Sequence, residues 1–337
     1  MSQATLSPLY RRSFDTAELV RSHPPCLTDD NKQFLYQLCC PPEIPHRGEI
    51  TVSRWPAMSL PEVIPASASK PLIESSERLF EYDPTPPDSH AVEWYLNFAN
   101  YDVFSAYGSP LFAQDEMQVA EHPALGSIRE ALLAAGMSMQ SVEDQQPAPI
   151  LVAGVERRCA VATDPDAARG RPNGLYGNNF AQALETTIEQ ATRVLDPPTI
   201  SNILAVEAPT FGFGKYTREQ IQHITATAYT GFSAARTESQ TLLDDEADTI
   251  IHTGFWGCGA YGGNRTLMTI LQLLAAQLSG INCLVFHTVD CMGTLKFERA
   301  RRMLAEESGR VDDPRSVSAL LDRIEGLGIQ WGTGDGT

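Results

Sequence analysis

The chain has 337 residues, and its 42 acidic side chains outnumber its 25 lysines and arginines, which gives a formal net charge of −17. Apolar residues make up 42% of it, enough for a sizeable core in one large domain or two smaller ones. The acidity argues against direct DNA binding, because phosphate contacts need clustered basic side chains. No apolar run reaches the ~18 residues of a membrane span, so no membrane partner is expected.

The cysteines indicate neither a disulfide framework nor a zinc site. There are seven of them, an odd number, and no Cys-x-x-Cys pair occurs. The N-terminal residues lack the apolar region of a secretory signal. We therefore expect a reduced, cytoplasmic protein without metal or cofactor. The sequence does not indicate its oligomeric state.

The first part of the chain is irregular in pattern. One helix is expected near Asp30–Leu38, and prolines recur between residues 56 and 71. We expect residues 1–80 to form an accessory N-terminal segment and residues 81–330 to form the functional domain.

From about residue 90, short apolar strands alternate with helical patterns. Strands are expected at Val92–Phe98, Ile150–Ala153, Ile203–Val206, Thr249–His252 and Cys283–His287. Helices are expected at Asp115–Glu121, Ser127–Leu133, Asn179–Leu195, Arg218–Ala235 and Arg265–Leu278, with two more between residues 292 and 327. This alternation predicts an α/β fold with parallel strand pairs and helices on both faces of the sheet. The last residues, 329–337, are expected to be loose.

One candidate ligand loop joins an apolar strand to an apolar helix. The segment HTGFWGCGAYGGNR (252–265) contains five glycines. Glycine permits positive φ angles and a close approach of backbone N–H groups to a ligand. The helix N-terminus that follows favours an anion such as a diphosphate. A glycine-rich crossover turn without a ligand is the alternative interpretation.

A second segment places acids at the start of a predicted helix. In LNFANYDVFSAYGSPLFAQDEMQ (96–118), a strand is followed by an irregular loop and then by Gln114, Asp115 and Glu116. Acids in a first helical turn are commonly solvated residues that favour the helix dipole. The alternative is a general acid/base, which needs partial burial to raise its pKa.

Together the two segments resemble the poly(ADP-ribose) glycohydrolases, a branch of the macrodomain fold. WGCGAYGG and the helix after it resemble the diphosphate-binding loop of that family, and FAN (98–100) with QDE (114–116) resembles its strand and catalytic signature. The segments ILAVEAPTF (203–211) and AYTGF (228–232) lie between them in the family's order. The resemblance covers about residues 80–290 and implies a macrodomain-like mixed sheet flanked by helices.

The resemblance implies roles for individual residues. Glu116 matches the catalytic glutamate, and Asp115 replaces a neighbouring glutamate that binds ribose hydroxyl groups. Asn100 matches an asparagine that contacts the same ribose, and Gln114 begins the signature. The substrate-binding residues implied by the diphosphate loop are Gly257, Cys258, Gly259, Ala260, Tyr261 and Gly262. Phe180 matches a tyrosine that closes over the ligand, in an alignment that needs a gap.

The chain also departs from the family pattern. Phe104, Ser105 and Ala106 replace three consecutive glycines, and Phe255 replaces a polar asparagine. The three side chains at 104–106 are expected to reshape the pocket for the distal ribose and phosphate. By the same resemblance, Phe104, Gln114 and Phe255 are expected to be among the substrate-binding residues. The aromatic residue that stacks on adenine falls near Thr288. We therefore expect a hydrolase that cleaves a ribosyl bond in an ADP-ribosyl or related NAD-derived conjugate, on a small substrate rather than a long polymer. The alternatives are an N-ribosyl hydrolase that acts on a small metabolite and a catalytically silent ADP-ribose-binding module.

Overall fold

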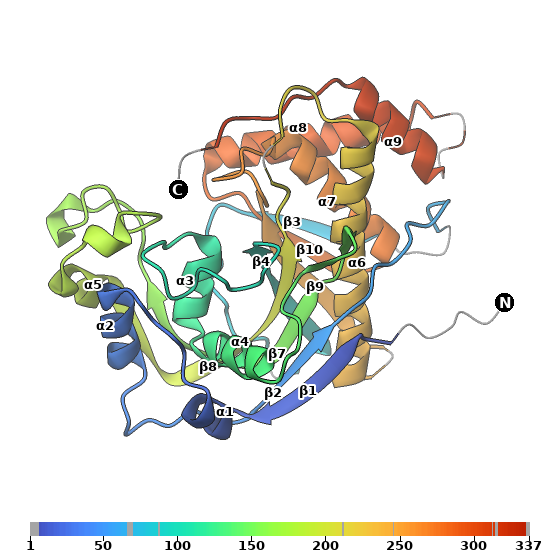
Figure 1. The fold of residues 1–337 in the computed structure, drawn as a ribbon. Helices are drawn as coiled ribbons and strands as arrows, with labels where there is room; N and C mark the ends of the chain where they lie inside the picture. Colours follow the sequence, from blue (N-terminus) through green and yellow to red (C-terminus); the bar gives the residue numbers. More distant parts are fainter. Residues whose placement is uncertain are drawn as a thin grey trace.

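A large mixed sheet forms the centre of the molecule (Figure 1). The computed structural model describes residues 7–65, 70–86, 88–210, 212–244, 246–311, 313 and 316–334. The strand order is β1-β2-β7-β8-β4-β9-β10-β3. The strand bounds are β1 Tyr10–Asp15, β2 Glu49–Arg54, β3 Leu72–Ser76, β4 Ala91–Ala99, β7 Ile150–Val161, β8 Thr192–Glu207, β9 Asp248–Gly254 and β10 Cys283–His287, and a separate hairpin pairs β5 Val142–Glu143 with β6 Gln146–Pro147.

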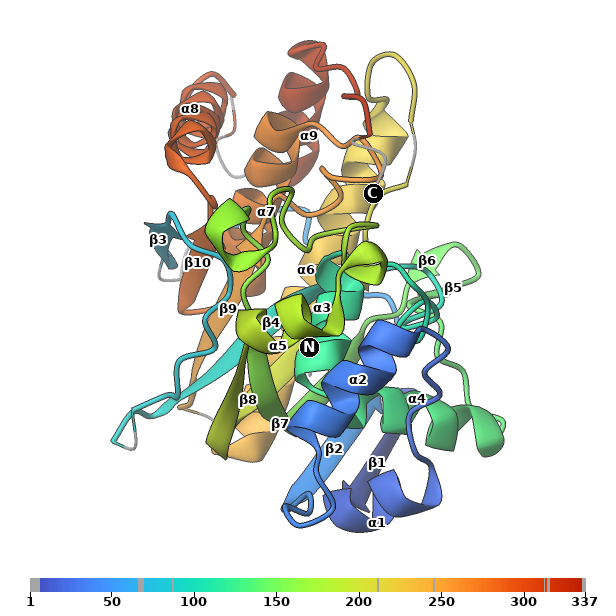
Figure 2. The ribbon, with the colours of Figure 1, turned by 90° about the vertical axis from the view of Figure 1, so that its left-hand side faces the viewer.

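Helices cover both faces of this sheet, as Figures 1 and 2 show from two directions. One group consists of α1 Thr16–Ser22, α2 Asp30–Cys39, α3 Gln114–Glu121, α4 Ala124–Ala134 and α5 Glu185–Ala191. The other consists of α6 Arg218–Leu242, α7 Arg265–Ser279, α8 Cys291–Ser308 and α9 Val317–Gly326. The expected α/β architecture is confirmed.

Alternating side chains of β4 face two separate apolar cores, one on each side of the sheet. Trp94 and Leu96 pack with the apolar faces of α6 and α7. Tyr95 and Ala99 point to the other face, where they pack with residues of α1, α3 and α4. This period of two is the one that a strand buried on both faces must have.

The parallel part of the sheet positions the functional segments. Strands β8, β4, β9, β10 and β3 run parallel, and β1, β2 and β7 complete the sheet with antiparallel pairs. Tyr95 of β4 is in register with Ile203 of β8 and with His252 of β9. The carboxyl ends of these strands therefore lie side by side, where open α/β sheets bind ligands.

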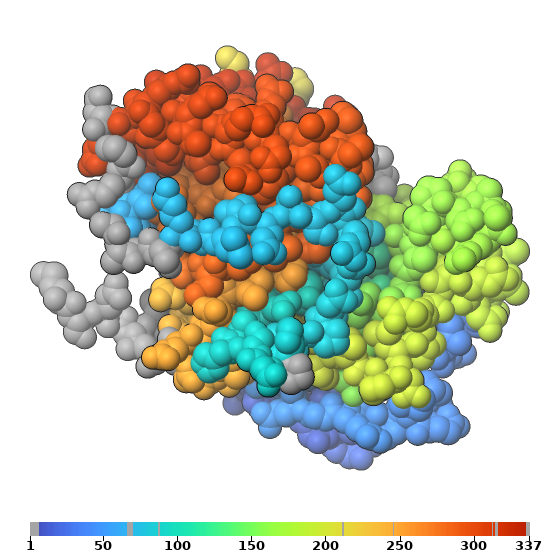
Figure 3. Space-filling view, turned by 180° about the vertical axis from the view of Figure 1, so that it is seen from behind, coloured from blue at the N-terminus to red at the C-terminus, as the bar shows by residue number. Residues whose placement is uncertain are grey.

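The N-terminal segment contributes to the same sheet. Strands β1 and β2 extend one edge, and β3 pairs with β10 at the opposite edge. From behind, residues 71–86, light blue to cyan, cross the surface below α8 (Figure 3). A division of the chain at residue 80 remains a prediction.

Most expected elements coincide with observed ones, and two expectations are wrong. The helix expected over 179–195 is instead a short 3-10 turn at Phe180–Gln182 and the helix α5, after which β8 begins at Thr192. Thr192 and Val194 pair with Val161 and Cys159 of β7, so the sheet extends into a stretch with helical spacing. The tail expected to be loose is hydrogen bonded through Ile329, Gln330 and Gly332, while residues 335–337 lie outside the described part.

Candidate active site

A pocket open to solvent lies at the carboxyl ends of β4, β8 and β9. It encloses about 710 Å³, including open solvent. Its lining residues are Phe98, Asn100, Ser105, Ala106, Leu111, Ala113, Gln114, Asp115, Glu116, Tyr176, Ala208, Gly257, Gly259, Ala260 and Tyr261. The acidic segment and the glycine-rich loop, far apart in the sequence, thus line one pocket.

Helix α3 is fixed to the end of β4 by the side chain of Gln114. Its Oε1 accepts a hydrogen bond from Phe98 N at 2.8 Å, and its Nε2 donates to Leu96 O at 3.1 Å. Both polar ends of this predicted substrate-binding residue therefore bind the strand backbone. At the same helix start, Glu116 Oε2 accepts from Ala113 N at 3.1 Å, which satisfies a backbone donor at the N-terminus of α3.

The two acids of α3 are buried rather than solvated. The side chain of Asp115 accepts a hydrogen bond from Asn97 Nδ2 at 3.0 Å, and Asn97 also donates to Gln118 Oε1 at 2.8 Å. Asp115 is 8% exposed and Glu116 is 4% exposed. Burial raises the pKa of both carboxyl groups, and the charge of Glu116 raises that of Asp115 further.

A buried lysine lies close enough to the acidic pair to influence it electrostatically. Lys32 of α2 is 2% exposed and donates from Nζ to Tyr107 O at 2.7 Å. Its positive charge partly offsets the upward shift in pKa of Asp115 and Glu116. Burial in turn lowers the pKa of Lys32 to about 8. Sequence analysis missed Lys32, because its place behind α3 depends on packing of the N-terminal segment.

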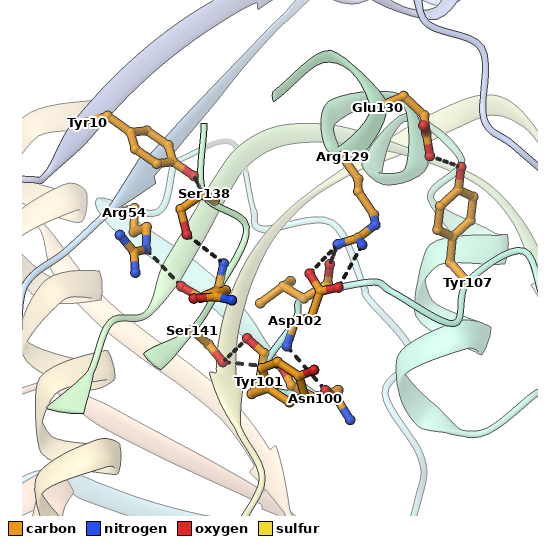
Figure 4. Close-up of polar contacts among 12 residues, drawn as sticks. Tyr10, Arg54, Asn100, Tyr101, Asp102, Tyr107, Arg129, Glu130, Ser138 and Ser141 are labelled. Carbon is orange, nitrogen blue, oxygen red and sulfur yellow. Dashed lines mark hydrogen bonds and ion pairs between the residues drawn. The ribbon is translucent and has the colours of Figure 1, made fainter. Parts of the chain in front are cut away.

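The loop after β4 is held by polar contacts with α4 and with the loop after it (Figure 4). The guanidinium of Arg129 binds both carboxylate oxygens of Asp102, at 2.7 and 2.9 Å. Ser141 Oγ donates to Tyr101 O at 3.2 Å. Within the loop, Asn100 Oδ1 accepts from Asp102 N at 3.2 Å. The backbone that borders the pocket is therefore fixed from outside it.

Phe104 keeps the backbone conformation of a glycine but does not line the pocket. Its φ angle is +59°, in the left-handed region that favours glycine, and its side chain is completely buried among the residues of the core under α4. Ser105 and Ala106, the next two residues, do line the pocket. The substitution of the glycines thus leaves only two small side chains at the pocket wall.

The glycine-rich loop forms the opposite wall. Gly257 has φ +71°, and a Cβ atom there would lie 2.9 Å from Pro209 Cδ. Gly263 N donates to Gly257 O at 2.8 Å, which closes the loop on itself. Asn264 then caps α7 by accepting from Thr266 N at 3.0 Å. Turn geometry therefore requires glycine at 257 and brings the N-terminus of α7 to the loop.

The two walls touch through a side-chain pair. Asn100 Nδ2 donates to Tyr261 Oη at 3.3 Å. Both residues line the pocket.

Besides Phe104, four predicted residues do not line the pocket. Phe180 is fully buried and stacks on Phe112 with ring centroids 3.9 Å apart. The half-buried Phe255 packs on Phe286 and beneath the guanidinium of Arg265. The remaining two are Cys258 and Gly262. Burial raises the pKa of the Cys258 thiol to about 12, and Gly262 is buried against Gly334.

The pocket also contains residues that the sequence did not single out. These are Leu111, Ala113, Tyr176 and Ala208. Tyr176 lies in an irregular stretch with no recognisable motif, so its position depends on how that stretch folds back toward α3. Leu111, Ala113 and Ala208 are small or apolar residues within the segments recognised in the sequence, and residue type alone did not distinguish them.

The described residues contain no cluster of three or more His, Cys, Asp or Glu side chains suited to a metal ion. Among the helices in the described part of the chain, none has both the length and the apolar character needed to cross a membrane.

Comparison with known proteins identifies the glycine-rich half of the site. Residues 172–294 match the family model described as poly(ADP-ribose) glycohydrolase, macro domain fold. The match includes the glycine-rich loop, and Gln114–Glu116 lie outside it. Over these residues it confirms the resemblance to that family and to its macro domain fold.

Solved structures of similar proteins include poly(ADP-ribose) glycohydrolases from two bacteria. The enzyme from Thermomonospora curvata has 16% identity and a TM-score of 0.46, with 86% of this chain and 85% of that chain covered. The enzyme from Deinococcus radiodurans, in complex with ADP-ribose, has 14% identity and a TM-score of 0.42, with 88% and 94% covered.

Proposed function

We propose that this chain, a divergent member of the poly(ADP-ribose) glycohydrolase family, is a glycosidase that hydrolyses a ribosyl bond in an ADP-ribosyl or related NAD-derived conjugate. The observation that carries the proposal is the shared pocket of the buried acids Asp115 and Glu116 and the glycine-rich loop. Such a pocket offers a carboxyl group of raised pKa on one wall and an anion-binding backbone on the other.

Glu116 is the proposed general acid and base. Its raised pKa favours a protonated carboxyl group that donates its proton to the leaving-group oxygen as the bond to the anomeric carbon breaks. The bonding electrons leave with that oxygen, and positive charge spreads over the ribose ring oxygen and anomeric carbon. The resulting carboxylate then takes a proton from water, whose oxygen bonds to the anomeric carbon.

The other pocket residues position the substrate in this proposal. The loop at Gly257, Gly259 and Ala260, with the N-terminus of α7, holds the diphosphate, whose negative charge offsets the positive charge of the transition state. Asn100 and Asp115 bind the ribose hydroxyl groups. Asp115 acts as a positioner, so the usual pair of catalytic carboxylates at a set separation is not required.

A small conjugate fits the pocket better than a long polymer. The side chains of Ser105 and Ala106 stand where the family has glycines, and Tyr176 stands at the same pocket. The net charge of −17 also disfavours a long polyanion. We place the reaction in the cytoplasm, where the seven free cysteine thiols stay reduced.

The test is the variant Glu116→Gln, which keeps the size of the side chain and removes its acid. Product release would be followed with mono-ADP-ribosylated peptide, poly(ADP-ribose) and NAD, and ADP-ribose binding would be measured by calorimetry. We expect turnover to fall by about 10²-fold or more, the range for a lost general acid, with nearly unchanged binding. Glu219→Gln, an exposed glutamate in the first turn of α6, is the matched control and should behave as the wild type.

Other results would support the alternatives. ADP-ribose binding by the wild type without turnover of any conjugate indicates a silent binding module. Release of a base from simple ribosides, without ADP-ribose binding, indicates an N-ribosyl hydrolase. Equal turnover by wild type and Glu116→Gln contradicts the proposed role of Glu116.

A further inference from the structure

The segment 329–334, which we call the C-terminal strap, crosses two loops that border the pocket. Toward the loop before α6, Ile329 O accepts from Tyr216 N at 3.0 Å and Trp331 N donates to Gly214 O at 2.9 Å. Toward the glycine-rich loop, Gly332 N donates to Gly262 O at 2.8 Å. The strap therefore ties together segments that reach the pocket at Ala208 and at 257–261.

Trp331 is the centre of this contact. Its ring stacks on Tyr216 with centroids 4.1 Å apart and planes 17° apart. A Cβ atom on Gly212 would lie 1.9 Å from the Trp331 ring, so only glycine permits the ring to pack there. Tyr216 Oη in turn accepts from Asn264 N at 3.0 Å, at the point where the glycine-rich loop enters α7.

Close backbone packing continues along the strap. Asn264 Nδ2 donates to Gln330 O at 3.0 Å. A Cβ atom on Gly262 would lie 2.8 Å from Gly334 N, and one on Gly334 would lie 2.3 Å from Ala260 O. The strap thus contacts the glycine-rich loop at both its middle and its end.

We propose that the C-terminal strap, with Trp331 as its positioning residue, holds the glycine-rich loop in its anion-binding conformation. A loop that is ordered before binding loses less conformational entropy when a ligand arrives, which strengthens binding. The acid Glu116 lies on α3 and makes no contact with the strap among the interactions above. The strap therefore affects binding of the diphosphate and leaves the bond-breaking step unchanged. This inference rests on the proposed function.

The experiment compares Trp331→Ala with the conservative variant Trp331→Phe. The control is Phe213→Ala, which removes a 99% exposed ring from the same loop before α6. Calorimetry would measure the affinity for ADP-ribose, and steady-state kinetics would give KM and kcat on the conjugate that the wild type cleaves. Hydrogen exchange of residues 256–264 would be followed in the absence of ligand. We expect Trp331→Ala to raise Kd and KM about tenfold at unchanged kcat and to speed exchange in the loop. Trp331→Phe should retain most of the affinity, and Phe213→Ala all of it.

Unchanged exchange in 256–264 together with wild-type affinity in Trp331→Ala would overturn the proposal. A fall in kcat at constant KM would also overturn it. If Trp331→Ala does not fold, a chain ending at Trp331 keeps the stacked ring and, within the described part of the tail, removes the contacts of residues 332–334. It should show the same changes to a smaller degree. If the wild type binds no ADP-ribose, the proposed function fails, while loop exchange still decides whether the strap orders the loop.

Discussion

At the residue scale, the buried acid Asp115 is a source of instability as well as a candidate ligand-binding group. Its carboxyl group is buried and is bonded to Asn97. Because folding raises its pKa, the folded state binds the proton more tightly than the unfolded state. The stability from this proton is present below the ordinary pKa of ~4 and is lost as pH rises through the raised pKa.

The variant Asp115→Asn should therefore stabilise the protein at alkaline pH. Asparagine keeps an oxygen that can accept from Asn97 and removes the buried charge. We expect its melting temperature to exceed that of the wild type by a few degrees at pH 8, with little gain at pH 5. Asp30→Asn, an exposed aspartate in the first turn of α2, is the control and should show no such gain. A gain for Asp115→Asn that is larger at pH 5 than at pH 8 would contradict the burial argument.

Phe104 shows where prediction from residue type stops. The sequence suggests that a phenylalanine in place of a glycine reshapes the pocket. The structure turns its ring into the core while the backbone keeps a glycine-like φ of +59°. The direction of that side chain depends on the loop path set by Arg129 and Asp102, and no local motif encodes it.

At the element scale, the glycine-rich loop combines backbone strain with a close approach. Gly257→Ala places a residue at φ +71° and a methyl group against Pro209. Gly136→Ala offers a matched control at the end of α4, because its φ is +67° and its added methyl group would meet open space. Both variants carry the cost of a left-handed conformation, ~1–2 kcal/mol.

Only Gly257→Ala should weaken ADP-ribose binding. We expect at least a tenfold rise in Kd for Gly257→Ala and none for Gly136→Ala, with both losing thermal stability. Calorimetry and thermal unfolding on the two variants check this. If the two variants bind ADP-ribose with equal affinity, the loop at Gly257 is not part of the binding site.

Elements with strong local patterns were predictable. The helix expected over Arg218–Ala235 is α6, which starts at a capping box of Thr217 and Gln220, and the apolar runs of β4 and β10 are strands. The helix expected over 179–195 failed because pairing with β7 draws Thr192 and Val194 into β8. A long-range partner there outweighs local spacing.

At the scale of the whole molecule, the sheet brings together two segments that lie about 140 residues apart in the sequence. The resemblance to a family places both at one site, and the parallel register of β8, β4 and β9 gives the physical reason. The strap and Lys32 could not be predicted in this way. The contacts are made by the backbone of the strap, by the ring of Trp331 and by the buried side chain of Lys32, and no sequence pattern marks these groups.

The central claim is that Glu116 acts on the terminal ribose of an ADP-ribosyl group while the glycine-rich loop holds the diphosphate of the same group. The most direct measurement is a crystal structure of the Glu116→Gln variant with ADP-ribose. The account predicts a diphosphate hydrogen bonded to backbone N–H groups between residues 257 and 262. It also predicts that the anomeric hydroxyl of the terminal ribose lies within about 3 Å of the side-chain amide introduced at position 116, the reach of an acid/base group. ADP-ribose bound elsewhere, or with that ribose turned away from α3, would contradict it.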